Sequence, residues 1–254
     1  MQRTLIVVAV AVVLLAAALA VFAPASLVAP FVERATLGNV AATATEGTLW
    51  RGRATLAAGP VQLPVAWTVA PLPLATGEAR IELMPVDATA SSPRADIRAS
   101  RNGLVLTGLA VAFPASVLQP ALLRAAKAPR GWIVAGDIAA GTPTLAWTPA
   151  AWSGGIDVDW RNAQLVPAES RPVALGDLSA RLVASGNRLA GPVANRGGEI
   201  DVRGDVAVGT TGESTVTLVL TPRRADDAEL ARALAAIGTA DGAGWRVSWQ
   251  SKPR

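Results

Sequence analysis

The chain has 254 residues, with 23 Lys and Arg, 19 Asp and Glu, and no His, Cys or Tyr. The missing side chains exclude thiol nucleophiles, disulfides, Cys/His zinc sites, His- or Cys-ligated haem and every Ser/His/Asp triad. A net charge of +4 is small for this length and does not indicate nucleic-acid binding. An apolar fraction of 51% beside 17% charged residues is typical of a membrane-linked or extensively buried chain.

An unbroken apolar run, Leu5–Phe22, follows the short N-terminal tip. At about 1.5 Å per residue, a helix of this length reaches across the hydrocarbon core of a bilayer. Arg3 and the amino terminus precede the run, so the positive-inside rule predicts a cytoplasmic N-terminus and an exported body. The alternative is a cleaved signal peptide, because Ala18-Leu19-Ala20 has the small-x-small form of a cleavage site. The lack of charge as far as Val32 favours an uncleaved, single-pass anchor.

The rest of the sequence is expected to form one exported body. We expect a cytoplasmic tip at residues 1–4, a transmembrane anchor at 5–23, a linker at 24–45 and a β-rich domain at 46–254. The triplet Ala-Trp-Thr occurs at residues 66–68 and again at 146–148, followed each time by glycine and an alternating segment. This weak repeat is consistent with two similar β units, 46–130 and 131–254, within the domain.

Beyond residue 33, apolar and polar residues alternate with a period of two. Ile200 and Val202 alternate with Asp201 and Arg203, and several other segments follow the same rule. Such alternation is typical of antiparallel strands with one packed face and one wet face. Frequent Gly, Pro and Asn residues separate the segments, and Asn102-Gly103 is a strong hairpin signal. The sequence therefore predicts an all-β, mainly antiparallel fold of about a dozen strands in twisted or curved sheets.

Two segments have helical periodicity instead. In Pro114–Lys127, apolar residues fall on one stripe, although Pro120 divides or kinks the segment. Ala225–Ile237 begins with acidic residues, which complement the helix dipole, and is followed by Gly238, a residue that often ends a helix. We therefore expect two short helices beside the strands.

Few residues are candidates for chemistry. Asp157 and Asp159 are two residues apart on a predicted strand, so both carboxylates would point to one side and could serve a hydrolase. The alternation of the strand already explains them as solvent-facing residues. The sequence contains no phosphate-binding loop, nucleophile elbow or EF-hand spacing. We expect no catalytic residue, no metal site and no cofactor.

Tryptophan is the most abundant aromatic residue, with eight Trp beside three Phe. These rings either fill the core beside small alanines or line an apolar surface that meets a partner. Arg51 and Arg53 flank Gly52 and could meet an acidic partner or lipid headgroups. The candidate partner-binding residues are Trp50, Arg51, Arg53, Trp67, Trp147 and Trp160.

Several segments together resemble the type II secretion system protein N family of Gram-negative inner-membrane proteins. The order and spacing of these segments extend over nearly the whole chain. Those that carry the resemblance are Glu46–Ala54, Val65–Pro71, Gly77–Leu83, Pro143–Pro149, Trp160–Ala163, Leu175–Leu178, Gly197–Gly204 and Leu220–Arg223.

The resemblance implies a non-enzymatic accessory component of the general secretory pathway, held in the inner membrane with a periplasmic β-rich body. Its implied partners are the inner-membrane platform proteins and the outer-membrane secretin. The family implies no catalytic residues. A looser similarity to periplasmic lipid-handling proteins of the AsmA type gives the alternative function, binding of a lipid or other amphiphile in an open apolar β-groove.

Overall fold

A single antiparallel sheet of 14 strands dominates the fold. The computed structural model describes residues 22–35, 40–58, 61–74, 76–86, 93–119, 123, 131–167, 171–224 and 226–251. The strands are β1 (Ala41–Gly47), β2 (Arg51–Ala58), β3 (Val61–Ala70), β4 (Glu78–Pro85), β5 (Arg94–Ser100), β6 (Gly103–Pro114), β7 (Ile133–Trp147), β8 (Trp152–Val166), β9 (Val173–Ser185), β10 (Arg188–Arg196), β11 (Ile200–Gly209), β12 (Ser214–Pro222), β13 (Thr239–Asp241) and β14 (Gly244–Ser251). The helices are η1 (Ala25–Val28), α2 (Ala29–Ala35), α3 (Pro71–Leu74), η2 (Ala115–Leu118) and α5 (Ala228–Ala235).

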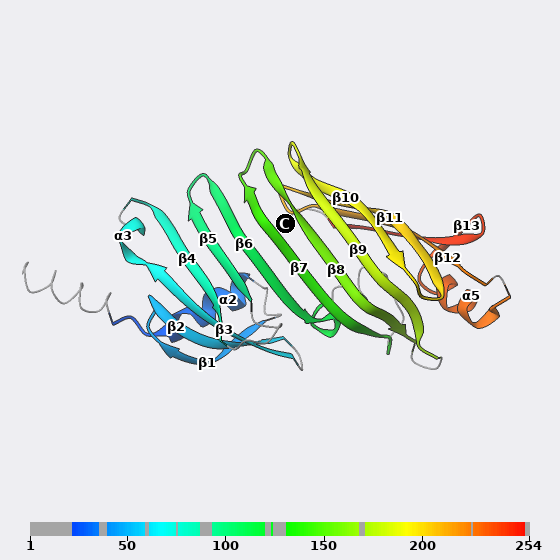
Figure 1. Ribbon diagram of the computed structural model, residues 1–254, viewed down its shortest axis with the longest axis horizontal. Coiled ribbons are helices and arrows are strands. Elements are labelled where there is room, and N and C mark those ends of the chain that lie inside the picture. Colours follow the sequence, from blue (N-terminus) through cyan, green and yellow to red (C-terminus); the bar gives the residue numbers. More distant parts are fainter. Residues whose placement is uncertain are drawn as a thin grey trace, which may run out of the picture.

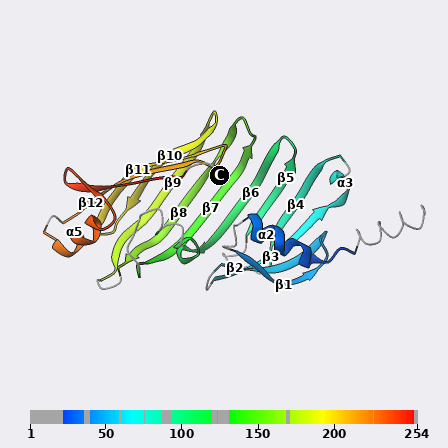
Figure 2. The ribbon, with the colours of Figure 1, turned by 180° about the vertical axis from the view of Figure 1, so that it is seen from behind.

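The sheet is a meander, because each strand up to β12 pairs with the next strand in sequence. At the C-terminal end the order is β12-β14-β13, so the short β13 forms that edge. Figure 1 shows the strands lying side by side across the long axis, from β1–β3 at one end to α5 at the other. The sheet twists strongly, and the C-terminal strands pass behind β7–β9 in this view, as the reverse view in Figure 2 confirms.

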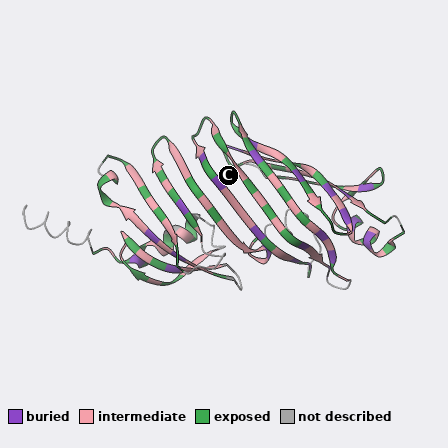
Figure 3. Cartoon of the chain, in the orientation of Figure 1, coloured by how far each residue is buried: buried purple, intermediate pink, exposed green. Residues whose placement is uncertain are grey.

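The two faces of the sheet have opposite character, as the alternation predicts. Ile81, Ile97, Leu106 and Leu145 are register partners on successive strands from β4 to β7, and they form an apolar row on one face. The next row, on the other face, is polar: it contains Thr68, Glu82, Asp96, Thr107 and Thr144. Figure 3 shows the resulting stripes of exposed and less exposed residues along the strands. The predicted all-β antiparallel fold is therefore confirmed.

Short helices cover parts of the apolar face. Leu230 and Leu234 of α5 are buried against strand residues that include Ile200 and Val202. This confirms the helix expected within residues 225–237. Of the other expected helix, Pro114–Lys127, the structure describes η2 and a few flanking residues, and residues 120–122 and 124–130 lie outside the description.

The expected linker, residues 24–45, contains η1, α2 and most of β1, which pairs with β2 as the first strand of the sheet. Strand β6 pairs with β7 across the expected boundary between residues 130 and 131, so the described body shares one sheet. Of the expected anchor, residues 5–23, only the last two lie within the description. Among the described helices, none has the length and apolar character needed to span a membrane.

Candidate interaction surfaces

The first group of candidate residues lies at the start of β2. Arg51 and Arg53 are exposed, and Arg53 forms an ion pair with Glu46 of β1 at 2.5 Å. The carbonyl oxygen of Trp50 accepts a hydrogen bond of 2.6 Å from the backbone N–H of Val69, and its side chain is half-buried. Arg51 and Arg53 are therefore the members of this group whose charge faces solvent.

Three of the candidate tryptophans tie distant parts of the chain together. The indole N–H groups of Trp67, Trp147 and Trp160 each donate a 3.0 Å hydrogen bond to a backbone carbonyl oxygen. Their acceptors belong to Leu49, Thr210 and Ala135, respectively.

The Trp147 bond joins the end of β7 to the turn between β11 and β12, which are not neighbours of β7 in the sheet. The six candidate residues do not converge on one site. Trp50, Arg51, Arg53 and Trp67 lie in or beside β2 and β3, whereas the other two lie on β7 and β8.

A more distinctive arrangement of charge lies on the polar face of β4 and β5. Arg80 is the direct register partner of Arg98, and Glu82 is the direct partner of Asp96. All four side chains are exposed. We call these four residues the charge square. Each of its two rows places like charges opposite each other, an arrangement that destabilises a sheet.

One member of the charge square, Arg80, has an ion-pair partner outside the square, Glu78 on the same strand. Arg80 donates through Nε to Glu78 Oε1 at 2.7 Å, and this bond lowers the pKa of the Glu78 carboxyl and raises the pKa of the Arg80 guanidinium. Within the described part of the chain, Arg98, Glu82 and Asp96 form no ion pair. Two carboxylates and a guanidinium are thus available to an outside molecule.

The charge square also lies in a hollow. It lines a shallow depression of about 300 Å³, together with neighbouring residues of β3 and β6 that include Thr68, Ala70 and Thr107. These neighbours have small side chains, and the four charged side chains of the square are exposed in the hollow. A partner surface with one acidic and one basic side chain would therefore be complementary to it: the acidic side chain would pair with the arginine row and the basic side chain with the carboxylate row.

Sequence reasoning missed the charge square because it depends on strand register. Arg80 and Glu82 were recognisable only as the polar side of an alternating strand. The order of charge is reversed in Asp96 and Arg98, so an antiparallel hairpin centred near residue 89 brings like charges together. That reversed order was the one available signal, and the six residues between Val86 and Pro93 gave no turn motif that would have fixed the centre.

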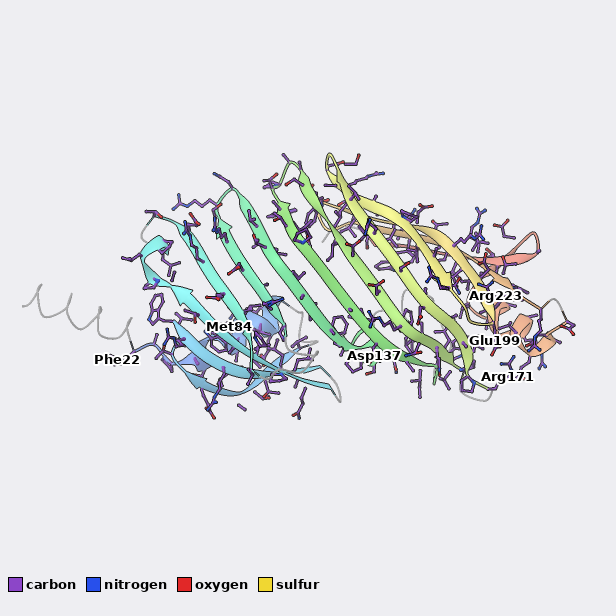
Figure 4. All side chains as sticks on the ribbon, viewed as in Figure 1. Phe22, Met84, Asp137, Arg171, Glu199 and Arg223 are labelled. Carbon is purple, nitrogen blue, oxygen red and sulfur yellow. The ribbon has the colours of Figure 1, made fainter. Side chains whose placement is uncertain are left out.

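A second charged cluster has a structural role at the far end of the molecule. Arg171, between β8 and β9, pairs with Glu199 at 2.7 Å and with Asp227 at 2.5 Å, and Figure 4 shows Arg171 beside Glu199 near α5. Asp227 also caps α5 by accepting the backbone N–H of Leu230 at 2.9 Å. That hydrogen bond and the nearby Arg171 guanidinium lower the pKa of the Asp227 carboxyl. The cluster therefore fixes the start of α5 to two loops.

Two polar atoms are buried among the apolar side chains. Thr142 on β7 is 4% exposed, and its Oγ1 has no hydrogen-bond partner among the described residues. The Nε1 of Trp152 on β8 is likewise buried without a described partner. Buried polar groups are nearly always hydrogen-bonded, so each of these unpartnered atoms is a local cost to the stability of the fold.

The carboxylates considered for catalysis lie on the wet face of β8. Asp157 accepts a hydrogen bond of 2.6 Å from Arg181 Nε of the neighbouring strand, and Asp159 has Ser179 as its register partner. In the described residues, no three His, Cys, Asp or Glu side chains gather as a possible metal site.

These features define an all-β protein that presents extended surfaces, one apolar and one charged, on a long curved sheet. A family model described as Type II secretion system (T2SS), protein N, matches residues 38–248. The chain therefore belongs to the type II secretion system protein N family, as the sequence resemblance predicted. Comparisons with curated proteins and with solved structures gave no match.

Proposed function

We propose that this protein is a non-enzymatic accessory component of the type II secretion machinery, anchored by Leu5–Phe22 in the inner membrane with its body in the periplasm. The family match supports a role in protein export. The apolar run and the positive charge before it support the topology. The platform proteins of the inner membrane and the secretin of the outer membrane are the proposed partners.

The charge square is the main structural support for the proposal that this protein docks on a partner. Two rows of like charge lower the stability of the isolated sheet. Binding of a partner with complementary charges would offset this cost. A partner that presents an acidic group to Arg98 and a basic group to Glu82 and Asp96 would convert this repulsion into attraction across an interface. Arg51 and Arg53 supply a second charged contact at the start of β2.

A charge swap within β5 tests this proposal. Changing Asp96→Arg together with Arg98→Asp keeps the composition but gives each row one positive and one negative charge. The isolated protein is expected to melt at a higher temperature, because repulsion across the strands becomes attraction. Co-purification with the platform proteins is expected to fall about tenfold or more, because like charges then face each other across the interface. Export of type II substrates is expected to fall with it.

The matching control is a swap of an internal pair on β8 and β9. Asp157→Arg with Arg181→Asp exchanges two exposed, directly opposed charges that already satisfy each other. This variant is expected to export substrates normally. Normal co-purification and export by the β5 swap, at normal protein levels, would refute docking through the charge square.

We also infer a second activity, the binding of a phospholipid or similar amphiphile on the apolar face. The apolar row of β4–β7 supports it, since Ile81, Ile97 and Leu106 are only half-buried. Because these side chains keep part of their surface open to solvent, acyl chains lying against them would bury further apolar area.

Quantitative mass spectrometry of lipids bound to the purified full-length protein tests this second activity. Ile97→Thr with Leu106→Thr replaces two apolar side chains of the row by polar β-branched ones. We expect this variant to retain less phospholipid per protein than the wild type, because acyl chains lose apolar contact area. Thr107→Ser, an exposed position on the polar face of β6, is the control. Equal lipid content in all three proteins would contradict the assignment.

A further inference from the structure

The connection between β3 and β4 carries two of the most exposed leucines of the structure. Residues 71–74 read Pro-Leu-Pro-Leu and form the single turn α3. Leu72 is 85% exposed and Leu74 is 42% exposed. A soluble domain has little reason to hold two large apolar side chains in water on one turn, so this leucine tip, Leu72 and Leu74, requires a partner.

The charges around the leucine tip favour a negatively charged partner surface. Leu74 lines a hollow together with Arg101, the exposed first residue of the β5–β6 turn. Arg101 forms no ion pair within the described part of the chain. Residues 70–77 contain no charged side chain, and the next carboxylate, Glu78, is already paired with Arg80 at 2.7 Å. The tip therefore combines apolar side chains with an unpaired guanidinium.

The leucine tip lies at the membrane end of the molecule. Figures 1 and 2 place α3 at the same end of the long axis as the first described residues, and Figure 4 places Phe22 there. Phe22 is 75% exposed and is the last residue of the predicted span, Leu5–Phe22. A bilayer that held this span would lie close to α3.

We propose that the leucine tip docks on the bilayer that holds the N-terminal span, with Leu72 and Leu74 at the acyl boundary and Arg101 on an anionic headgroup. Leucine side chains bury favourably at this depth, and a neighbouring cation adds attraction to anionic lipids. The inference rests on the membrane anchoring in the proposed function. It adds a second contact with the membrane, which would fix the orientation of the sheet relative to the bilayer.

The absence of native cysteine allows a direct test with a single fluorescent label. Thr76→Cys carries an environment-sensitive fluorophore next to the leucine tip and leaves both leucines in place. The labelled full-length protein is reconstituted into vesicles of phosphatidylethanolamine and phosphatidylglycerol that contain a spin-labelled quencher lipid. Docking is expected to shift the emission to shorter wavelength and to quench about half of it, since the tip reaches about 5–10 Å into the boundary region.

Three variants separate the possible results. A label at Val183→Cys, an exposed position on β9, is expected to show no shift and no quenching. Leu72→Asp with Leu74→Asp is expected to abolish both effects at residue 76. Arg101→Glu is expected to reduce quenching in vesicles with phosphatidylglycerol but not in phosphatidylcholine vesicles, because only the former carry net negative charge.

The outcome distinguishes the docking from the anchor. If the protein floats with the vesicles but the labels at 76 and 183 behave alike, docking of the leucine tip is refuted and the anchor stands. If the wild-type protein fails to float with the vesicles at all, the anchor and the docking that rests on it are both refuted.

Discussion

Replacing Trp67 by alanine is expected to lower the free energy of unfolding by about 3–5 kcal/mol, the range for removing a buried aromatic ring. Trp67 is 5% exposed and packs in a small core with Ala25, Ala54 and Val65. Leu56, Ile81 and Leu83 also pack against this core, and the pairing of their strands limits how far they can move into the space that the indole leaves. Urea unfolding of the purified protein, followed by far-ultraviolet circular dichroism, measures the change.

The indole also performs a task that a phenyl ring cannot. Its N–H donates to the Leu49 carbonyl oxygen at 3.0 Å, and its ring lies so close to Gly52 that a Cβ there would overlap it. Trp67→Phe keeps most of the buried area but leaves that carbonyl without its donor. We expect it to cost about 1–3 kcal/mol. A Trp67→Ala protein as stable as the wild type would show that this core does not hold β2 and β3 together.

The second large loss of stability is expected at the opposite end of the sheet. Leu234 of α5 is 1% exposed in the core that contains Ile200 and Val202. Leu234→Ala is expected to lower the free energy of unfolding by about 2–5 kcal/mol, because it combines lost apolar burial with a cavity. The same urea titration measures it.

The leucine tip provides a control with identical chemistry. Leu72→Ala removes the same atoms from a side chain that is 85% exposed. In detergent solution its effect is expected to stay within about 0.5 kcal/mol, as is usual for exposed positions. If the two leucine variants lost equal stability, then α5 would not be part of the folded core.

Local patterns in the sequence predicted the elements of the fold well. Alternation in segments such as 200–203 identified strands, and acidic residues at 226 and 227 identified the start of a helix that the structure places at Ala228. These signals are local, because a strand or a helix buries one face according to its own period. The Asn102-Gly103 signal located this hairpin to within one residue: the two turn residues are Arg101 and Asn102, and Gly103 is the first residue of β6.

Contacts between residues that are far apart in the chain could not be predicted from the sequence. The acceptor of the Trp147 indole lies 63 residues away, and no local pattern indicates which turn will meet it. The charge square required the register of β4 and β5, which is set by packing of Ile81 against Ile97 and by the length of the connection. Single sequences show which residues are polar, but the pairing of strands decides which polar residues meet.

The meander has a mechanical consequence. Fourteen strands at about 4.8 Å spacing give a ribbon about 60 Å wide along the sheet, from β1 to β13. Figure 1 shows the strands running obliquely across the long axis, so tension between the two ends would act partly along the hydrogen bonds of each ladder. Under such tension we expect the strand pairs to separate one after another, so that the protein lengthens in steps. Contacts between distant strands, such as the one that Trp147 makes, would resist the first openings.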